Sequence, residues 1–197
     1  MEKEPNRRGW KNFTWKRPRD HWGYKKYVLY DQIEITDIKQ GKLGDCYFLS
    51  CLSAIAENPE RIKRIFRTQE VNEAGIYAVN LWIADEKRVV VVDDYFPYDE
   101  KKGHFAFSRP SGGNEIWVLI LEKAWAKVFG SYSRIEVGDC GEAMAPLTGC
   151  PNSSIYFEDY KSPNEIWDFL LWADTKTFPM CCAANSAEEL NTEGLNT

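Results

Sequence analysis

The chain has 197 residues, of which 44% are hydrophobic, 14% aromatic and 28% charged, and its net charge is −5. This composition is ordinary for a folded protein, and the length suits one large domain or one domain with an arm. No run reaches the roughly 18 apolar residues that a membrane span requires, and the charged N-terminus lacks a signal-peptide core. We therefore expect no transmembrane segment, no secretion and a cytoplasmic location.

Cysteine and histidine are both sparse. The chain has six cysteines without a C-x-x-C pair, and its only histidines are His21 and His104. Neither a zinc ribbon, a Cys/His zinc cage nor a disulfide framework is predicted from this spacing. We expect most of the thiols to be reduced and buried. The shortage of histidine bears on catalysis, because many enzymes use an imidazole for proton transfer.

Positive charge is concentrated in residues 1–27, which hold nine basic and three acidic residues, whereas residues 28–197 carry a net charge of −11. The same segment is rich in aromatic residues and shows no periodicity, so we interpret it as an irregular basic arm. Basic and aromatic residues together can bind single-stranded nucleic acid. Because no folded nucleic-acid motif is present, we favour the alternative, in which the arm docks on the acidic body and no nucleic acid is bound.

The rest of the chain predicts a mixture of helices and strands. Apolar residues repeat at helical spacing after Cys46, and Gly75 opens a run of strand-like residues. The predicted order is a loop over 31–45, a helix from Cys46 to Asn58-Pro59, a short helix over Arg61–Arg67, antiparallel strands Ile76–Ile83 and Lys87–Asp94, a loop over Tyr95–Gly113, a helix from the N-cap Asn114 to Phe129, a loop over Ser131–Pro151, a helix from Ser162 to Ala173 and a strand over Phe178–Ala183. Helices and strands fall in separate stretches, which indicates the α+β class.

The most informative local feature is the segment Gln40–Leu49, which reads Gln-Gly-Lys-Leu-Gly-Asp-Cys-Tyr-Phe-Leu. Its two glycines allow a tight turn into a helix that begins at or beside Cys46. The free backbone N–H groups and the positive end of the helix dipole at that point favour a thiolate, which is the nucleophilic form of cysteine. The same N–H groups can stabilise the oxyanion formed on a substrate carbonyl, with the Gln40 amide as a second donor. On spacing alone, a buried and inert cysteine is an equally good interpretation.

Gln40–Leu49 resembles the catalytic-cysteine motif of the calpain family of papain-like cysteine proteases. Further segments are similar to that family and occur in the expected order over nearly the whole chain. These are Trp15-Lys16-Arg17-Pro18, Thr36-Asp37-Ile38, Val91-Val92-Asp93-Asp94 with Pro97, Asn114-Glu115-Ile116-Trp117, Leu121–Lys127 and Leu147-Thr148-Gly149. The resemblance implies a papain-like α+β fold, mainly the helical cysteine-bearing subdomain with a small antiparallel sheet, over residues 28–197.

The resemblance also implies an activity and roles for single residues. A protein or peptide substrate is expected, with Cys46 as nucleophile and with Gln40 and the Cys46 backbone N–H forming the oxyanion hole. Gly138 aligns with a glycine that pairs with the substrate backbone. Three departures from the family pattern surround this site: Tyr47 replaces a usual tryptophan, Ile35 replaces a frequent basic residue, and Asp139-Cys140-Gly141 replaces a loop of small residues. Cys140 is a candidate reactive thiol or an ordinary loop cysteine.

A calcium ion is the cofactor that the resemblance implies. Asp37 and Glu115 match its acidic ligands, and the carbonyls of Tyr30 and Gln32 fall where the family uses backbone ligands. Calcium prefers hard oxygen ligands of both kinds on a flexible loop. Without the resemblance, each acid is read as a solvated surface carboxylate, and Glu115 as a first-turn helix residue.

A cysteine protease also requires a general acid and base. The resemblance places this histidine, with an asparagine that orients it, on a second subdomain, and neither His21 nor His104 fits that position. The chain is thus expected to end before the His/Asn subdomain. Two hypotheses remain: the chain is the cysteine-bearing half of a calcium-dependent endopeptidase, inactive alone, or it is a non-catalytic calpain-like module that binds calcium or a protein partner.

Overall fold

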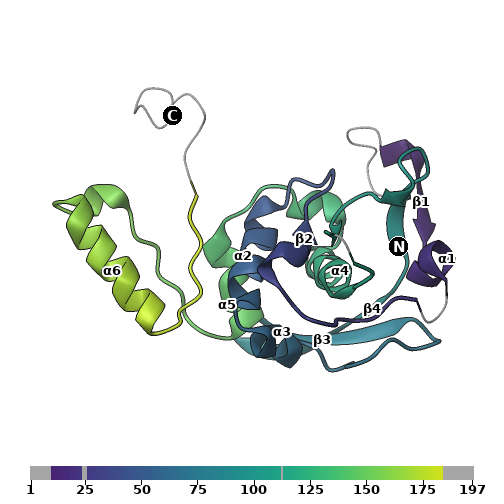
Figure 1. Cartoon of the computed structure of the whole chain (residues 1–197), viewed down its shortest axis with the longest axis horizontal. Helices are drawn as coiled ribbons and strands as arrows, with labels where there is room; N and C mark the ends of the chain where they lie inside the picture. Colours follow the sequence, from purple (N-terminus) through teal and green to yellow (C-terminus); the bar gives the residue numbers. More distant parts are fainter. Residues whose placement is uncertain (1–9, 24–25, 112, 184–197) are drawn as a thin grey trace.

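The computed structural model describes residues 10–23, 26–111 and 113–183. It combines helices with small antiparallel sheets, which confirms the α+β class (Figure 1). In chain order the elements are η1 (Trp10–Asn12), β1 (Phe13–Lys16), α1 (Pro18–Trp22), η2 (Ile35–Asp37), β2 (Ile38–Lys39), α2 (Cys46–Ala56), α3 (Pro59–Ile65), β3 (Ile76–Ile83), β4 (Glu86–Asp93), β5 (Phe96–Asp99), β6 (His104–Phe105), β7 (Arg109–Pro110), α4 (Trp117–Phe129), η3 (Tyr132–Ile135), α5 (Cys140–Thr148), η4 (Phe157–Asp159) and α6 (Pro163–Thr175).

The helix α4 forms the centre of the core. Every residue from Trp117 to Ala126 is buried, so this helix is covered on all sides, as its nearly continuous apolar sequence requires. The ring of Trp125 stacks on that of Phe48 from α2, with centroids 5.2 Å apart. Gly130 ends the helix in the left-handed conformation, as predicted. In Figure 1, α4 is seen nearly end-on, between α2 and the strands at the N-terminal side.

The strands β3 and β4 form the predicted hairpin. Ile76 pairs with Asp93 at one end and Ile83 with Glu86 at the other. The two connecting residues, Ala84 and Asp85, both have positive φ angles, as the tight turns that match the strand twist require. Alternate residues of β3 are buried against α4 and α5, so the sheet has one buried face.

The prediction of an irregular arm is wrong for residues 10–22. Strand β1 pairs antiparallel with β5, which in turn pairs with β6. Trp10, Phe13 and Trp22 pack against the core and Tyr27 is buried in it, whereas Tyr24 lies outside the described residues. The alternative in which the arm docks on the body is therefore confirmed for its described part. Strand β1 has only four residues, which are too few for the alternation of buried and exposed side chains in a strand to be recognised in the sequence.

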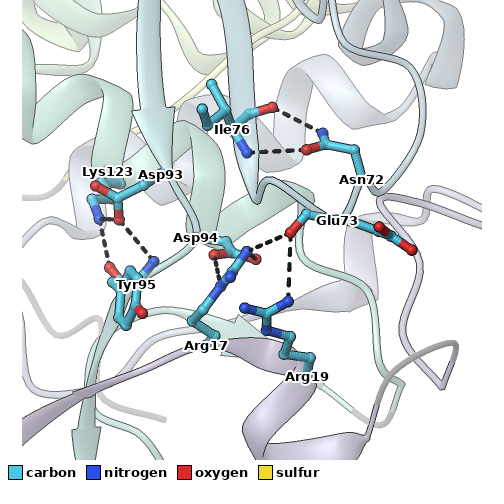
Figure 2. A network of polar contacts seen from close by, with 9 residues as sticks. All are labelled: Arg17, Arg19, Asn72, Glu73, Ile76, Asp93, Asp94, Tyr95 and Lys123. Carbon is cyan, nitrogen blue, oxygen red and sulfur yellow. Dashed lines mark hydrogen bonds and ion pairs between the residues drawn. The ribbon is translucent and has the colours of Figure 1, made fainter.

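A buried ion pair secures this docking (Figure 2). Arg17 Nε donates to Asp94 Oδ1 at 2.5 Å and Arg17 Nη2 donates to Asp94 Oδ2 at 3.2 Å. Hydrogen bonding to Asp94 raises the pKa of Arg17. Close by, Lys123 Nζ donates to Asp93 Oδ1 at 2.6 Å and to the Tyr95 carbonyl at 2.5 Å. The end of β4 is thus joined both to the arm and to the central helix.

Five local predictions are corrected. The N-cap of α4 is Ile116, because the Asn114 side chain donates instead to the Lys26 carbonyl. The predicted loop over 31–45 contains η2 and β2. The predicted loop over Tyr95–Gly113 contains β5, β6 and β7. The predicted loop over Ser131–Pro151 contains η3 and α5, whose Pro146 and Gly141 conceal its helical character. The segment Phe178–Ala183 is not a strand, since no described segment pairs with it.

The helix α6 extends away from the other helices (Figure 1). It starts at the predicted place, where Ser162 caps it by accepting a hydrogen bond from Glu165 N. Trp167, Leu171 and Trp172 are exposed on its surface. A cavity of about 430 Å³ lies beside α6, and no residue that lines it belongs to the predicted site. None of the helices among the described residues has the length and apolarity to cross a membrane.

Candidate active site

The loop before α2 is positioned by close backbone contacts. A Cβ atom at Gly41 would lie 2.1 Å from the Phe107 carbonyl oxygen, so only glycine fits there. Lys42 N donates to the Ala106 carbonyl at 2.9 Å. The Gln40 side chain spans the loop, with its Nε2 donating to the Leu43 carbonyl at 2.9 Å. These contacts place the turn from Gln40 to Asp45 against the segment that follows β6.

Cys46 is the first residue of α2, as the sequence predicts, and its side chain is exposed. The N–H groups of Phe48 and Leu49 donate to the Asp45 carbonyl. The N–H groups of Cys46 and Tyr47 have no acceptor among the described residues. The interpretation of Cys46 as a buried cysteine is therefore wrong, and the thiol lies beside unused backbone donors.

Gly138 lies directly beside this helix start. Val137 N donates to the Gly44 carbonyl at 2.9 Å, which joins the segment before α5 to the loop before Cys46. A Cβ atom at Gly138 would lie 2.6 Å from Tyr47 Cζ. The Tyr47 ring is itself fixed, because its hydroxyl accepts a hydrogen bond from Trp125 Nε1 at 3.0 Å. The structure thus brings Gly138 next to the residue that follows Cys46.

Two buried carboxyl groups behind Cys46 were not predicted from the sequence. Asp45 and Glu122 are 0% and 2% exposed, respectively. Glu122 Oε1 accepts a hydrogen bond from Ser108 N at 2.9 Å, whereas no N–H or hydroxyl group of the described residues reaches the Asp45 carboxyl. Burial raises the pKa of Asp45 to about 6, and burial together with Asp45 raises that of Glu122. The only signal in the sequence was Glu122, an acidic residue inside the apolar helical run that forms α4.

The predicted calcium ligands Asp37 and Glu115 lie near one another. Burial is the main cause that raises the pKa of Glu115, and the negative charges of Asp37 and Asp31 add to it. Glu115 Oε1 accepts from Asp31 N at 2.5 Å and Oε2 from Trp117 Nε1 at 3.1 Å. Asp37 Oδ2 accepts from Glu34 N at 2.6 Å. Each of these oxygens retains a second lone pair for a cation.

The backbone near Glu115 also offers oxygen ligands. No described N–H group donates to the carbonyls of Tyr30 and Gln32, which lie in the segment between Val28 and η2. The buried Glu115 carboxylate near Asp37 and Asp31 is unfavourable unless a cation or a proton compensates its charge. The donor set of carboxylates and carbonyls therefore fits a hard cation such as calcium.

Both histidines lie at the sheet formed by β1, β5 and β6. His21 Nδ1 lies 3.1 Å from the Tyr98 hydroxyl, and burial lowers the pKa of His21. His104 Nδ1 lies 2.8 Å from the Phe105 carbonyl. In the described part of the chain, neither imidazole forms a hydrogen bond with Cys46. The structure therefore supplies a thiol with backbone donors but supplies no imidazole paired with that thiol.

Together these features define an α+β fold in which an exposed cysteine stands at the start of a helix. The family model of the calpain family cysteine proteases matches residues 1–197. This chain belongs to that family.

Individual relatives agree with this assignment. The chain is 31% identical to the calpain-1 catalytic subunit of Homo sapiens over 194 residues, which is 97% of this chain and 26% of that protein. It is 41% identical to the calpain-type cysteine protease ADL1 of Oryza sativa subsp. japonica over 149 residues, which is 74% of this chain and 7% of the relative. The calpain-type cysteine protease DEK1 of Zea mays is 40% identical over a stretch of the same length. The chain thus spans about a quarter or less of these relatives.

Proposed function

We propose that this chain is the cysteine-bearing half of a calpain-type cysteine endopeptidase with a protein or peptide substrate. The observation that carries this proposal is the exposed Cys46 thiol beside the unused N–H groups of Cys46 and Tyr47. The thiolate attacks the substrate carbonyl, and the backbone donors stabilise the oxyanion. Water then hydrolyses the acyl-enzyme.

The Gln40 amide is the proposed second oxyanion donor. Its Nε2 uses one N–H group to hold the Leu43 carbonyl, which leaves the second N–H group of the same nitrogen for the substrate. Gly138 is the proposed contact with the substrate backbone. A side chain there would collide with Tyr47, so glycine allows this backbone segment to lie directly beside the residue that follows Cys46.

The general acid and base are proposed to come from a His/Asn-bearing subdomain outside this chain. Proton transfer from the thiol and to the leaving amine requires such a group. Both described histidines are instead bonded within the sheet region, to Tyr98 and to the Phe105 carbonyl. Activity is therefore proposed for the two subdomains joined, with this half inactive alone.

Calcium is proposed as the cofactor, with Asp37 and Glu115 as carboxylate ligands and with Tyr30 and Gln32 as carbonyl ligands. The ion supplies charge compensation for acids that repel one another. The chain's own residues order the loop between Val28 and η2, because the N–H groups of Ile116 and Trp117 donate to the Leu29 carbonyl. This pairing joins the loop to the start of α4.

A cytoplasmic location is part of the proposal. All six cysteines are free thiols, which is typical of a reducing compartment.

The expectation that most of them are buried is wrong: Cys51 alone is buried among the six, Cys140 and Cys181 are partly buried, and Cys46, Cys150 and Cys182 are exposed.

The test of the proposal is peptide hydrolysis by this chain joined to a His/Asn-bearing calpain subdomain. With calcium present, we expect turnover of a fluorogenic peptide, and we expect Cys46→Ala to abolish it. Cys150→Ala is the matched control, because this thiol is also exposed but lies outside the site. Turnover that survives Cys46→Ala would exclude Cys46 as the nucleophile.

Calcium binding is tested separately on the chain itself. Glu115→Gln keeps the shape of the side chain but removes its charge, so calorimetric titration should show strongly weakened binding. Glu57→Gln, which changes an exposed acid at the end of α2, should bind calcium as the unaltered chain does. Equal binding by Glu115→Gln would remove this residue from the ligand set.

The alternative function is a non-catalytic calpain-like module that binds calcium or a protein partner. It is favoured by one observation, the engagement of both described histidines away from Cys46. The joined protein distinguishes the two functions, because a module of this kind would bind calcium yet show no Cys46-dependent turnover when the histidine is supplied.

A further inference from the structure

Three cysteines that are far apart in the sequence converge on one point of the fold. Cys51 lies in α2, Cys140 is the first residue of α5, and Cys181 lies in the segment after α6. Their sulfur atoms all lie within 4.8 Å of one another. Cys51 and Cys181 are 130 positions apart, so no local motif could have indicated this cluster.

The spacing of the sulfurs matches a metal-thiolate centre. The Sγ atoms of Cys51 and Cys181 are 3.8 Å apart. Two thiolates on a tetrahedral ion with zinc–sulfur bonds of about 2.3 Å are separated by about 3.8 Å, which is the edge of that tetrahedron. A disulfide requires a sulfur separation of about 2.05 Å and uses only two of the three thiols.

We propose that Cys51, Cys140 and Cys181 form a site for one thiophilic divalent cation of the zinc type. Three sulfur ligands select a soft ion over calcium or magnesium, which prefer oxygen. The three thiolates leave one tetrahedral position for a water molecule. This site is separate from the proposed calcium site, whose ligands are oxygens of other segments.

One ligand of the cluster stands at the start of a helix. Cys140 stands at the N-terminal end of the nine-residue helix α5, where the helix dipole favours negative charge. Metal binding displaces the protons of the three thiols to solvent, so each sulfur binds the ion as a thiolate.

A metal here would join three segments around the candidate active site. Cys51 belongs to the same helix as Cys46, and Cys140 follows Gly138 by two positions, with its Sγ 3.7 Å from the Tyr47 carbonyl. Cys181 adds the segment that leaves α6. We therefore expect the ion to stabilise the folded state and to order the segment around Cys181.

The test is metal binding by the full 197-residue chain, with zinc and cobalt(II) as probes. We expect one zinc ion per chain after dialysis, a sulfur-to-cobalt charge-transfer absorption on cobalt(II) addition, and an increase in Tm with zinc. Cys140→Ser and Cys181→Ser should each lose the charge-transfer band and the zinc-dependent increase in Tm. Because both residues are only partly buried, these variants are expected to fold, which circular dichroism checks.

Two matched controls define the site. Cys150→Ser removes an exposed thiol elsewhere, and Cys182→Ser removes the exposed neighbour of Cys181. Both should retain one zinc ion and the cobalt band. The proposal is overturned if the unaltered chain shows no sulfur-to-cobalt band, if Cys140→Ser and Cys181→Ser keep it, or if mass spectrometry of the freshly purified chain finds a disulfide within the cluster.

Discussion

Gly138 and Tyr47 are in such close contact that a Cβ atom at position 138 would lie 2.6 Å from Tyr47 Cζ. Tyr47 cannot easily move away, because its hydroxyl is bonded to Trp125 Nε1 and its ring is buried. The two residues therefore fix the distance between the start of α2 and the segment that enters α5. This contact links the geometry around Cys46 to a residue more than 90 positions later.

Gly138→Ala should destabilise the chain. An added methyl group against a fixed ring forces the backbone to shift, and such overpacking costs about 1–3 kcal/mol. Urea denaturation measures this loss. The control is Gly113→Ala, since a Cβ atom there has no neighbour closer than 4.0 Å. Equal stability of the two variants would show that the segment at Gly138 yields without cost.

Arg17→Met should weaken the docking of the arm. The change leaves Asp94 buried without its partner, and breaking a buried ion pair costs about 3–5 kcal/mol. Arg88→Met is the matched control, because Arg88 pairs with Glu86 at the surface, where a pair contributes about 0–1 kcal/mol. Thermal denaturation of both variants compares their losses of stability. A loss no larger for Arg17→Met than for Arg88→Met would contradict the anchoring role.

Glu122→Gln should change the pH dependence of stability. The folded pKa of Asp45 is raised to about 6, above its unfolded value, so the folded state binds more protons than the unfolded state between about pH 4 and 6. The free energy of unfolding therefore falls as the pH rises through this window, by up to about 3 kcal/mol for Asp45. Glu122 is a second buried carboxyl group with a raised pKa, so it adds to the fall, whereas burial remains the main cause of the Asp45 contribution. Glu122→Gln removes the Glu122 contribution, so the total fall should be smaller and the stability at neutral pH higher.

Urea titrations from pH 4 to pH 7 test this expectation. Glu57→Gln, an exposed change, should keep the slope of the unaltered chain. If Glu122→Gln retains the full slope, the pKa of Glu122 is not raised in the folded state.

The six thiols should differ in their rates of alkylation. Cys46, Cys150 and Cys182 are exposed, so iodoacetamide should modify them in the folded chain. Cys51 is fully buried and should be modified only after unfolding. Peptide mapping by mass spectrometry after timed labelling gives the order. Modification of Cys51 as fast as that of Cys150 would contradict the packing of α2 against α5.

Much of the fold follows from local sequence. The helical spacing after Cys46, the turn at Ala84 and Asp85 and the stop at Gly130 were predictable, because each depends on side chains or backbone angles a few residues apart. The position of Cys46 at a helix start was predictable for the same reason. The arm strand β1 and the helix α5 were not, since β1 is defined by its pairing with β5 and α5 contains unfavourable helix residues.

The family was therefore determined by the sequence alone, through one local segment that contains the proposed nucleophile Cys46 and a set of matching segments in order. The tertiary structure decided what lies around Cys46. Asp45 meets Glu122, Tyr47 meets Gly138, and Cys51 meets Cys140 and Cys181, because the packing of α2 against α4 and α5 brings distant residues together. No spacing along the chain contains these contacts, since each depends on how separate elements pack in three dimensions.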